Sequence, residues 1–146
     1  MESSRWRSRA HRLVGTLGVL GFLASGLRMH FGYGHLRDFD AATRLSFRSI
    51  HIYLLFASLL NLGVAPGAVF RLASSRRRLV ETIGSVLVLA GPFLFGIAFL
   101  REPLLPSLDR SVTRLGIIAC AMGTILMALV HGGRDRPSAL RRRRIT

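Results

Sequence analysis

The sequence feature that most constrains the fold is an uncharged stretch of 22 residues between Arg48 and Arg71. A helix of this length, at about 1.5 Å rise per residue, crosses a hydrocarbon core of about 30 Å. Half of the residues in the chain are hydrophobic, and the mean hydropathy of +0.40 is too high for an ordinary soluble domain. We therefore predict a membrane-spanning helix over this stretch.

Polar and small residues within the stretch recur at helical spacing. The stripe consists of His51, Leu54, Ser58, Asn61 and Ala65. Its spacings of 3, 4, 3 and 4 confine it to an arc of about 80° on one helix face. Because lipid cannot satisfy an amide or an imidazole, the stripe predicts a protein neighbour on that face.

Three further apolar runs predict three more helices. The four expected spans cover about 13–31, 49–70, 79–100 and 115–133, between a basic lead at 1–12 and a basic tail at 134–146. Short connections make consecutive membrane helices antiparallel neighbours. We predict an all-α integral membrane protein with four transmembrane helices in an up-down-up-down bundle. A cleaved signal peptide is the competing interpretation of the first run, since a basic lead and an apolar core are followed by Ala24-Ser25-Gly26.

The distribution of positive charge predicts the orientation. The chain has 21 basic residues, all arginine, against seven acidic ones. Their short clusters alternate with the apolar runs, which argues against nucleic acid as a partner. The lead, the 71–78 turn and the tail hold fourteen arginines, and the other side holds seven. By the positive-inside rule, both termini are cytoplasmic in a bacterial inner membrane, and the basic termini contact anionic lipid.

Small residues mark the faces on which helices are expected to pack. Gly18, Gly21 and Ser25 share one face of the first span, together with Arg28. In the fourth span, the corresponding face carries Gly116, Ala119 and Gly123. Small residues allow two backbones to approach closely, so we predict that these residues pack helices together, with Ser58 and Asn61 on the second span.

Two ionisable residues lie within or beside the spans. Arg28 lies near the outer end of the first span, where we expect an acidic partner from among Asp38, Asp40, Glu102 and Asp109. Glu81 lies in the expected first turn of the third span, where the helix dipole favours a carboxylate. A similarity between 40–45 (D-A-A-T-R-L) and 109–115 (D-R-S-V-T-R-L) leaves open a duplication of two hairpins.

Cofactor binding is a minority hypothesis. His30 and His51 are expected at similar depth on adjacent helices and could ligate a b-type haem. However, His30 falls about 160° from the small-residue face of its own helix, which argues against this pair. A quinone site would use Arg28, Arg48, His51 and Tyr53 near the outer boundary. No metal-ligand motif is present, so no metal site is predicted.

The sequence also lacks a phosphate loop, a nucleophile elbow and paired catalytic carboxylates, and it has one cysteine, Cys120. We therefore favour a non-enzymatic accessory subunit or scaffold that associates with itself or with another membrane protein. A small dimeric transporter is the first alternative, although it needs an ionisable residue at mid-membrane and only Asn61 lies near that depth. Electron transfer through haem or quinone is the second.

Overall fold

The computed structural model describes residues 2–65, 75–105 and 109–132, with side chains described from residue 6 to residue 130 within these ranges. The described residues contain four long helices and no strand. These are α1 (Glu2–Leu27), α2 (Ala41–Val64), α3 (Ser75–Arg101) and α4 (Ser111–Gly132). All four helices are long and apolar enough to cross a membrane. The prediction of an all-helical protein with four candidate spans is therefore confirmed.

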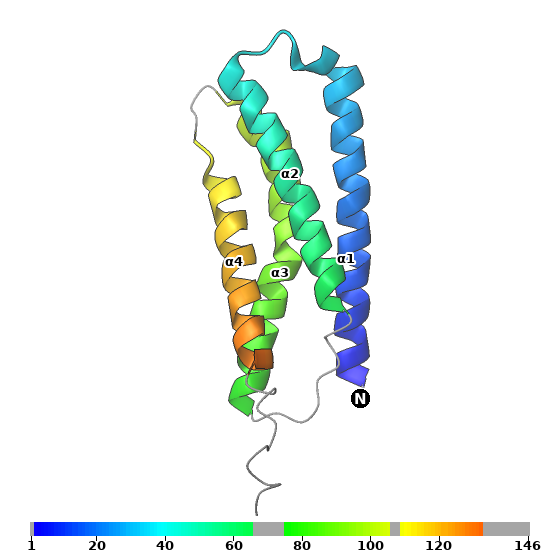
Figure 1. The fold of residues 1–146 in the computed structure, drawn as a ribbon, viewed down its shortest axis with the longest axis vertical. Helices are drawn as coiled ribbons and strands as arrows, with labels where there is room; N and C mark the ends of the chain where they lie inside the picture. Colours follow the sequence, from blue (N-terminus) through cyan, green and yellow to red (C-terminus); the bar gives the residue numbers. More distant parts are fainter. Residues whose placement is uncertain (1, 66–74, 106–108, 133–146) are drawn as a thin grey trace, which may run out of the picture.

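The four helices lie side by side (Figure 1). A π-helical turn, η1 (Arg28–Gly32), and a short 3-10 turn, η2 (Gly34–Leu36), follow α1. Another 3-10 turn, η4 (Glu102–Leu104), follows α3. The most extensive contacts join α3 to α4 and α1 to α2, and further contacts join α2 and α1 to α3. Since α2 and α4 hardly touch, α3 is the helix that contacts all the others.

All four helices begin earlier than the predicted spans, and α1 and α3 begin within basic segments. No glycine or proline occurs between residues 2 and 14, so nothing in the basic lead ends the helix. The lead therefore continues α1 toward its N-terminus by about three turns. Likewise, α3 begins at Ser75 and takes in three arginines of the basic turn. These extensions bring side chains of the lead against α2 and α3.

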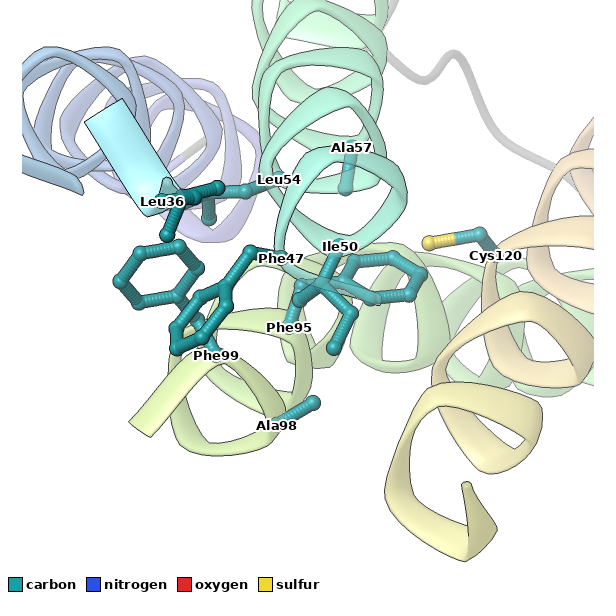
Figure 2. Close-up of a cluster of buried hydrophobic side chains, with 9 residues drawn as sticks. All are labelled: Leu36, Phe47, Ile50, Leu54, Ala57, Phe95, Ala98, Phe99 and Cys120. Atoms are coloured by element: carbon teal, nitrogen blue, oxygen red, sulfur yellow. The ribbon is translucent and has the colours of Figure 1, made fainter. Parts of the chain in front are cut away.

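The apolar core lies where α2 and α3 meet below the α1–α2 connection. It consists of Leu36, Phe47, Ile50, Leu54, Ala57, Phe95, Ala98, Phe99 and Cys120. Figure 2 shows Leu36, Phe47 and Phe99 gathered at one end of the cluster, with Cys120 pointing toward it from α4. Gly34, His35 and Leu36 all have positive φ angles, of 51°, 60° and 61°. This left-handed turn reverses the chain and lets Leu36 reach the core.

Large apolar side chains cover the outside of every long helix. Examples from the four helices in order are Leu20, Leu59, Val86 and Ile118, all more than half exposed. An apolar surface on all sides of a bundle is unfavourable in water and typical of helices in contact with lipid.

Candidate functional site

A cluster of buried polar side chains lies between α1, α2 and α3. Its members are all less than 9% exposed: Ser8, His11, Ser58, Asn61, Glu81 and Ser85. They come from the N-terminal half of α1, the C-terminal half of α2 and the N-terminal half of α3. Figure 1 places these half-helices at the end of the molecule that holds the N-terminus. Polar groups buried among apolar helices need hydrogen-bond partners, and such clusters are the first candidates for function.

His11 joins three helices through its two ring nitrogens. Its side chain is fully buried, with 0% exposure. Nδ1 lies 2.7 Å from Oδ1 of Asn61 on α2, and Nε2 lies 2.7 Å from Oγ of Ser85 on α3. One imidazole on α1 therefore fixes the rotation of all three helices relative to one another.

The partners of Asn61 define which nitrogen of His11 carries the proton. Nδ2 of Asn61 donates to the carbonyl oxygens of Ala57 and Val88, both at 2.9 Å. Because carbonyls only accept hydrogen bonds, the amide nitrogen must face them, and Oδ1 must face His11. Nδ1 of His11 then donates to Asn61. In the neutral ring, Nε2 accepts a hydrogen bond from the hydroxyl of Ser85.

A hydroxyl, an imidazole and an amide in this order resemble, in geometry, the relay that activates a serine nucleophile. Activation requires that the hydroxyl reach a substrate. Ser85 is only 2% exposed, so its oxygen has no open face from which to attack. The arrangement is suited to holding helices together rather than to acyl transfer.

Two further hydrogen bonds tie the N-terminal part of α1 to its neighbours. The hydroxyl of Ser8 donates to the carbonyl oxygen of Ala65, at the C-cap of α2, over 2.8 Å. A terminal amino group of Arg7 donates to Oγ1 of Thr82 on α3 over 2.9 Å. The segment expected to be a cytoplasmic lead therefore packs as part of the bundle.

Glu81 differs from its expected setting. Because α3 begins at Ser75, Glu81 lies beyond the first turn, and an explanation based on a first-turn carboxylate is wrong. Its side chain is 2% exposed and lies one turn before Ser85 on the same helix face. The cluster therefore contains a buried carboxylic acid as well as an imidazole.

Most of the predicted packing residues lie at close helix contacts, whereas Gly21 does not. A Cβ at Gly18 would overlap Ser58 and lie 3.2 Å from Pro92, whereas one at Gly21 would lie 3.8 Å from Leu54. On the α3–α4 side, a Cβ at Gly123 would lie 2.8 Å from the carbonyl oxygen of Gly84. One at Gly116 would meet the Phe95 ring at 2.9 Å, and Ala119 is buried.

The two histidines of the haem hypothesis have separate partners. His51 stacks on Phe22, with ring centroids 4.0 Å apart, and its Nδ1 lies 2.8 Å from Oγ of Ser25. His30 is exposed and packs against Phe31 and His35, with a centroid distance of 3.9 Å to the latter. Haem ligation by this pair would require both rings to leave these contacts.

The residues of the quinone hypothesis also pack against different neighbours. The ring of Tyr53 packs against Phe95 with centroids 5.6 Å apart. Arg48 is exposed on α2. Arg28 contacts neither of them, and instead its Nε donates to Oη of Tyr33 over 3.2 Å, with the guanidinium 5.4 Å from that ring centroid.

The expectation of an acidic partner for Arg28 is wrong for all four candidates. Asp40 accepts hydrogen bonds from the amides of Ala42 and Thr43, at 2.8 and 3.0 Å, and caps α2. Asp109 pairs with Arg114 over 2.7 Å, and Asp38 is exposed. Each of these carboxylates caps a helix, pairs with another arginine or is exposed. The side chain that contacts Arg28 is instead the hydroxyl of Tyr33.

Glu102, the remaining candidate, caps α4 from outside the helix. Its Oε1 accepts hydrogen bonds from the amides of Val112 and Thr113, at 2.6 and 3.0 Å, and its Oε2 accepts one from the hydroxyl of Thr113. The same chemistry occurs at α2, where the hydroxyl and amide of Thr43 hold the pKa of Asp40 below its ordinary value. The two similar sequence segments thus both cap a helix through threonine, but Asp109 is not the equivalent of Asp40.

His11 is not among the site residues predicted above, although the sequence carries a signal for it. The small-residue stripe of the first span extends toward the N-terminus as Ser8, His11, Gly15 and Gly18, at spacings of 3, 4 and 3. All four residues are buried. Assigning residues 1–12 to a separate lead stopped the periodicity at the wrong place.

Comparison with known proteins adds no constraint, since no family model, curated protein or solved structure matches the chain.

Proposed function

We propose that the chain is a multi-pass protein of a bacterial inner membrane, with four helices in an up-down-up-down bundle and both termini in the cytoplasm. Four helices of sufficient length and apolar character support this placement, as does the apolar exterior of each. The arginine clusters supply the orientation. Contact between the basic segments and anionic headgroups follows from the same placement.

Within that membrane the protein acts as a non-enzymatic accessory subunit or scaffold that binds another membrane protein or a second copy of itself. The observation that carries this proposal is the His11–Asn61–Ser85 connection. All three side chains are buried, and each is satisfied by a partner on a neighbouring helix. Their polar atoms are used to position helices, and the exposed helix faces remain available to a partner.

Reporter fusions test the placement. A fluorescent protein fused after Thr146 should be fluorescent because it stays in the cytoplasm. Alkaline phosphatase inserted between Gly34 and Asp38 should be active because that connection is exported. The reverse pattern would overturn the orientation, and a fluorescent tail together with an inactive phosphatase would overturn membrane insertion.

Partner recovery tests the scaffold role. The full chain is affinity-purified from membranes, and co-purifying proteins are compared between wild type and Asn61→Ala. If Asn61 holds helices together, partner recovery falls in proportion to the amount of folded protein. A variant that keeps full abundance and thermal stability but loses its cellular phenotype would show that Asn61 acts chemically, contrary to the scaffold proposal.

A small dimeric transporter is the second candidate, and one observation favours it. Glu81 and His11 place ionisable groups inside candidate spans, where such groups often mark ion or proton paths. Proteoliposomes containing the protein and a pH-sensitive dye distinguish the two proposals. A scaffold carries no proton flux, whereas a transporter would show a flux that Glu81→Gln abolishes.

A further inference from the structure

An apolar groove lies between α1 and α3, with Leu54 of α2 contributing to its lining. Its volume is about 330 Å³, within the range of about 300–1,000 Å³ that ligand sites occupy. Small residues of α1, Gly18, Gly21 and Ala24, face Pro92 and Gly96 of α3 across it. The groove therefore exists because small residues on two facing helices leave the space between the helices unfilled.

The glycines show that the space can accept additional atoms. A Cβ at Gly96 would meet no atom within 4 Å, and one at Gly21 would make only an ordinary contact at 3.8 Å with Leu54. By contrast, Gly18 is closed off by Ser58 and Pro92 at the base of the groove. In a close-packed bundle, an apolar gap of this size needs an apolar occupant.

One positive charge borders the groove. Arg28 is part of the lining, next to Ser25 at the end toward η1. Its Nε is used by Tyr33, whereas its two terminal amino groups make no hydrogen bond to any described residue. No carboxylate among the described residues lies within ion-pair distance of it. A guanidinium whose two terminal amino groups are available can bind a phosphate through two parallel hydrogen bonds.

We propose that the groove binds one acyl chain of an anionic phospholipid, with the phosphate of that lipid on Arg28. The inference rests on the proposed membrane placement. An apolar groove that ends at one cation matches an amphiphile with a hydrocarbon chain and an anionic head. An uncharged amphiphile would leave Arg28 without a counter-charge, and a soluble anion would leave the groove empty.

Photolabelling tests the site. The full chain is reconstituted in phosphatidylcholine bilayers with a trace of phosphatidylglycerol that carries a photoactivatable group on one acyl chain. Labelled residues are then mapped by mass spectrometry. Gly21 and Ala24 should be labelled about fivefold more than the exposed Ile118, as a preference of about 1 kcal/mol gives. Replacing part of the phosphatidylcholine by unlabelled phosphatidylglycerol should remove this preference, whereas replacing the same part by phosphatidylethanolamine, which has no net charge, should not.

Two substitutions and a matched control identify the groove as the source of the preference. Gly96→Leu places a side chain in the open space and should reduce labelling of Gly21 and Ala24 to the level of Ile118. The control is Gly63→Leu on α2, where a Cβ also meets nothing within 4 Å but which lies outside the groove lining. Arg28→Gln should leave the lipid acyl chain in the groove, but the two unlabelled phospholipids should then compete equally with the labelled one.

The outcomes separate the site from the membrane placement. Even labelling of all apolar helix faces would overturn the lipid site and leave the membrane placement intact. Absence of label from every helix would overturn the membrane placement itself. Stronger competition by an uncharged isoprenoid quinone than by phosphatidylglycerol would overturn the choice of ligand. Crosslinks from the groove to a second copy of the protein would also overturn the choice of ligand.

Discussion

At the scale of single residues, the buried side chains of His11, Asn61 and Ser85 are matched donor to acceptor. Asn61 uses its amide nitrogen on two carbonyls and its oxygen on His11, which in turn contacts Ser85. Such a set is stable only while it is complete, since a buried polar group without a partner costs about 1–3 kcal/mol. The network is therefore sensitive to any single deletion.

Replacing His11 tests this sensitivity. His11→Ala should lower the free energy of unfolding by about 1–3 kcal/mol, because Oδ1 of Asn61 and Oγ of Ser85 lose their shared partner. Unfolding is measured in detergent by heat or denaturant. His30→Ala is the control, since this histidine is exposed, and it should change stability by less than about 0.5 kcal/mol. Equal effects of the two substitutions would contradict the proposed network.

Asp40, which lies outside the candidate spans, predicts a pH dependence of stability. Hydrogen bonds from Thr43 and Ala42 lower the pKa of Asp40 in the folded protein. The cap therefore stabilises α2 fully above the unfolded pKa of about 3.9, and its contribution is lost as pH falls through the lower folded value. Thermal unfolding between pH 7 and pH 3 should show this loss. Asp40→Asn, which keeps a cap without a titrating carboxyl group, should have a flatter response over the same range.

At the scale of elements, the two helices that follow the α1–α2 and α3–α4 connections start by different means. The cap of α2 is local, from Asp40 to Thr43, whereas that of α4 comes from Glu102, nine residues before the helix begins. The buried carboxylate of Glu102 joins the end of α3 to the start of α4. The order of α4 therefore depends on the end of α3.

Removing the Glu102 carboxylate should release the first turn of α4. Glu102→Ala should destabilise the protein by about 1–3 kcal/mol, since two amides and one hydroxyl lose their acceptor in a buried site. Hydrogen exchange at Val112 and Thr113 should accelerate, as measured by mass spectrometry. Asp109→Ala removes only the exposed pair with Arg114 and should cost no more than about 1 kcal/mol. A larger effect from Asp109 would restore it as the cap.

At the scale of the whole molecule, large apolar side chains cover the outside of the bundle as well as filling its core, and a cluster of polar side chains is buried between the helices. Leu59 is 52% exposed on α2, two positions before the fully buried Asn61. A water-soluble bundle has a polar exterior, so the apolar exterior added to an apolar core accounts for the high mean hydropathy of the chain.

A charge on the outer face tests this organisation. Leu59→Arg should lower the membrane-inserted yield, because an arginine within a span costs up to about 2.5–3.5 kcal/mol on insertion, the full cost applying at the centre. Membrane fractions are compared by immunoblot with those of Leu59→Met, which should insert normally. An unchanged yield together with greater solubility without detergent would show that this face contacts water.

The sequence by itself determined which helix faces turn inward. The 3–4 spacing of Ser58 and Asn61 on one helix, and of Gly116, Ala119 and Gly123 on another, follows from local backbone geometry alone. For the same reason, the four spans and their apolar exteriors could be predicted without any knowledge of neighbours. All four helices extend beyond the predicted spans toward their N-termini, because an arginine can bound an apolar run without ending a helix.

Only the tertiary structure decided which side chains meet. His11 finds Asn61 and Ser85 across 50 and 74 residues of chain, Glu102 reaches Thr113, and Tyr33 rather than an acid lies against Arg28. Periodicity places a residue on a face, but it carries no information about the relative height and rotation of two helices. Hydrogen bonds form only within about 3 Å, so a shift of one helical turn, about 5.4 Å, exchanges every partner.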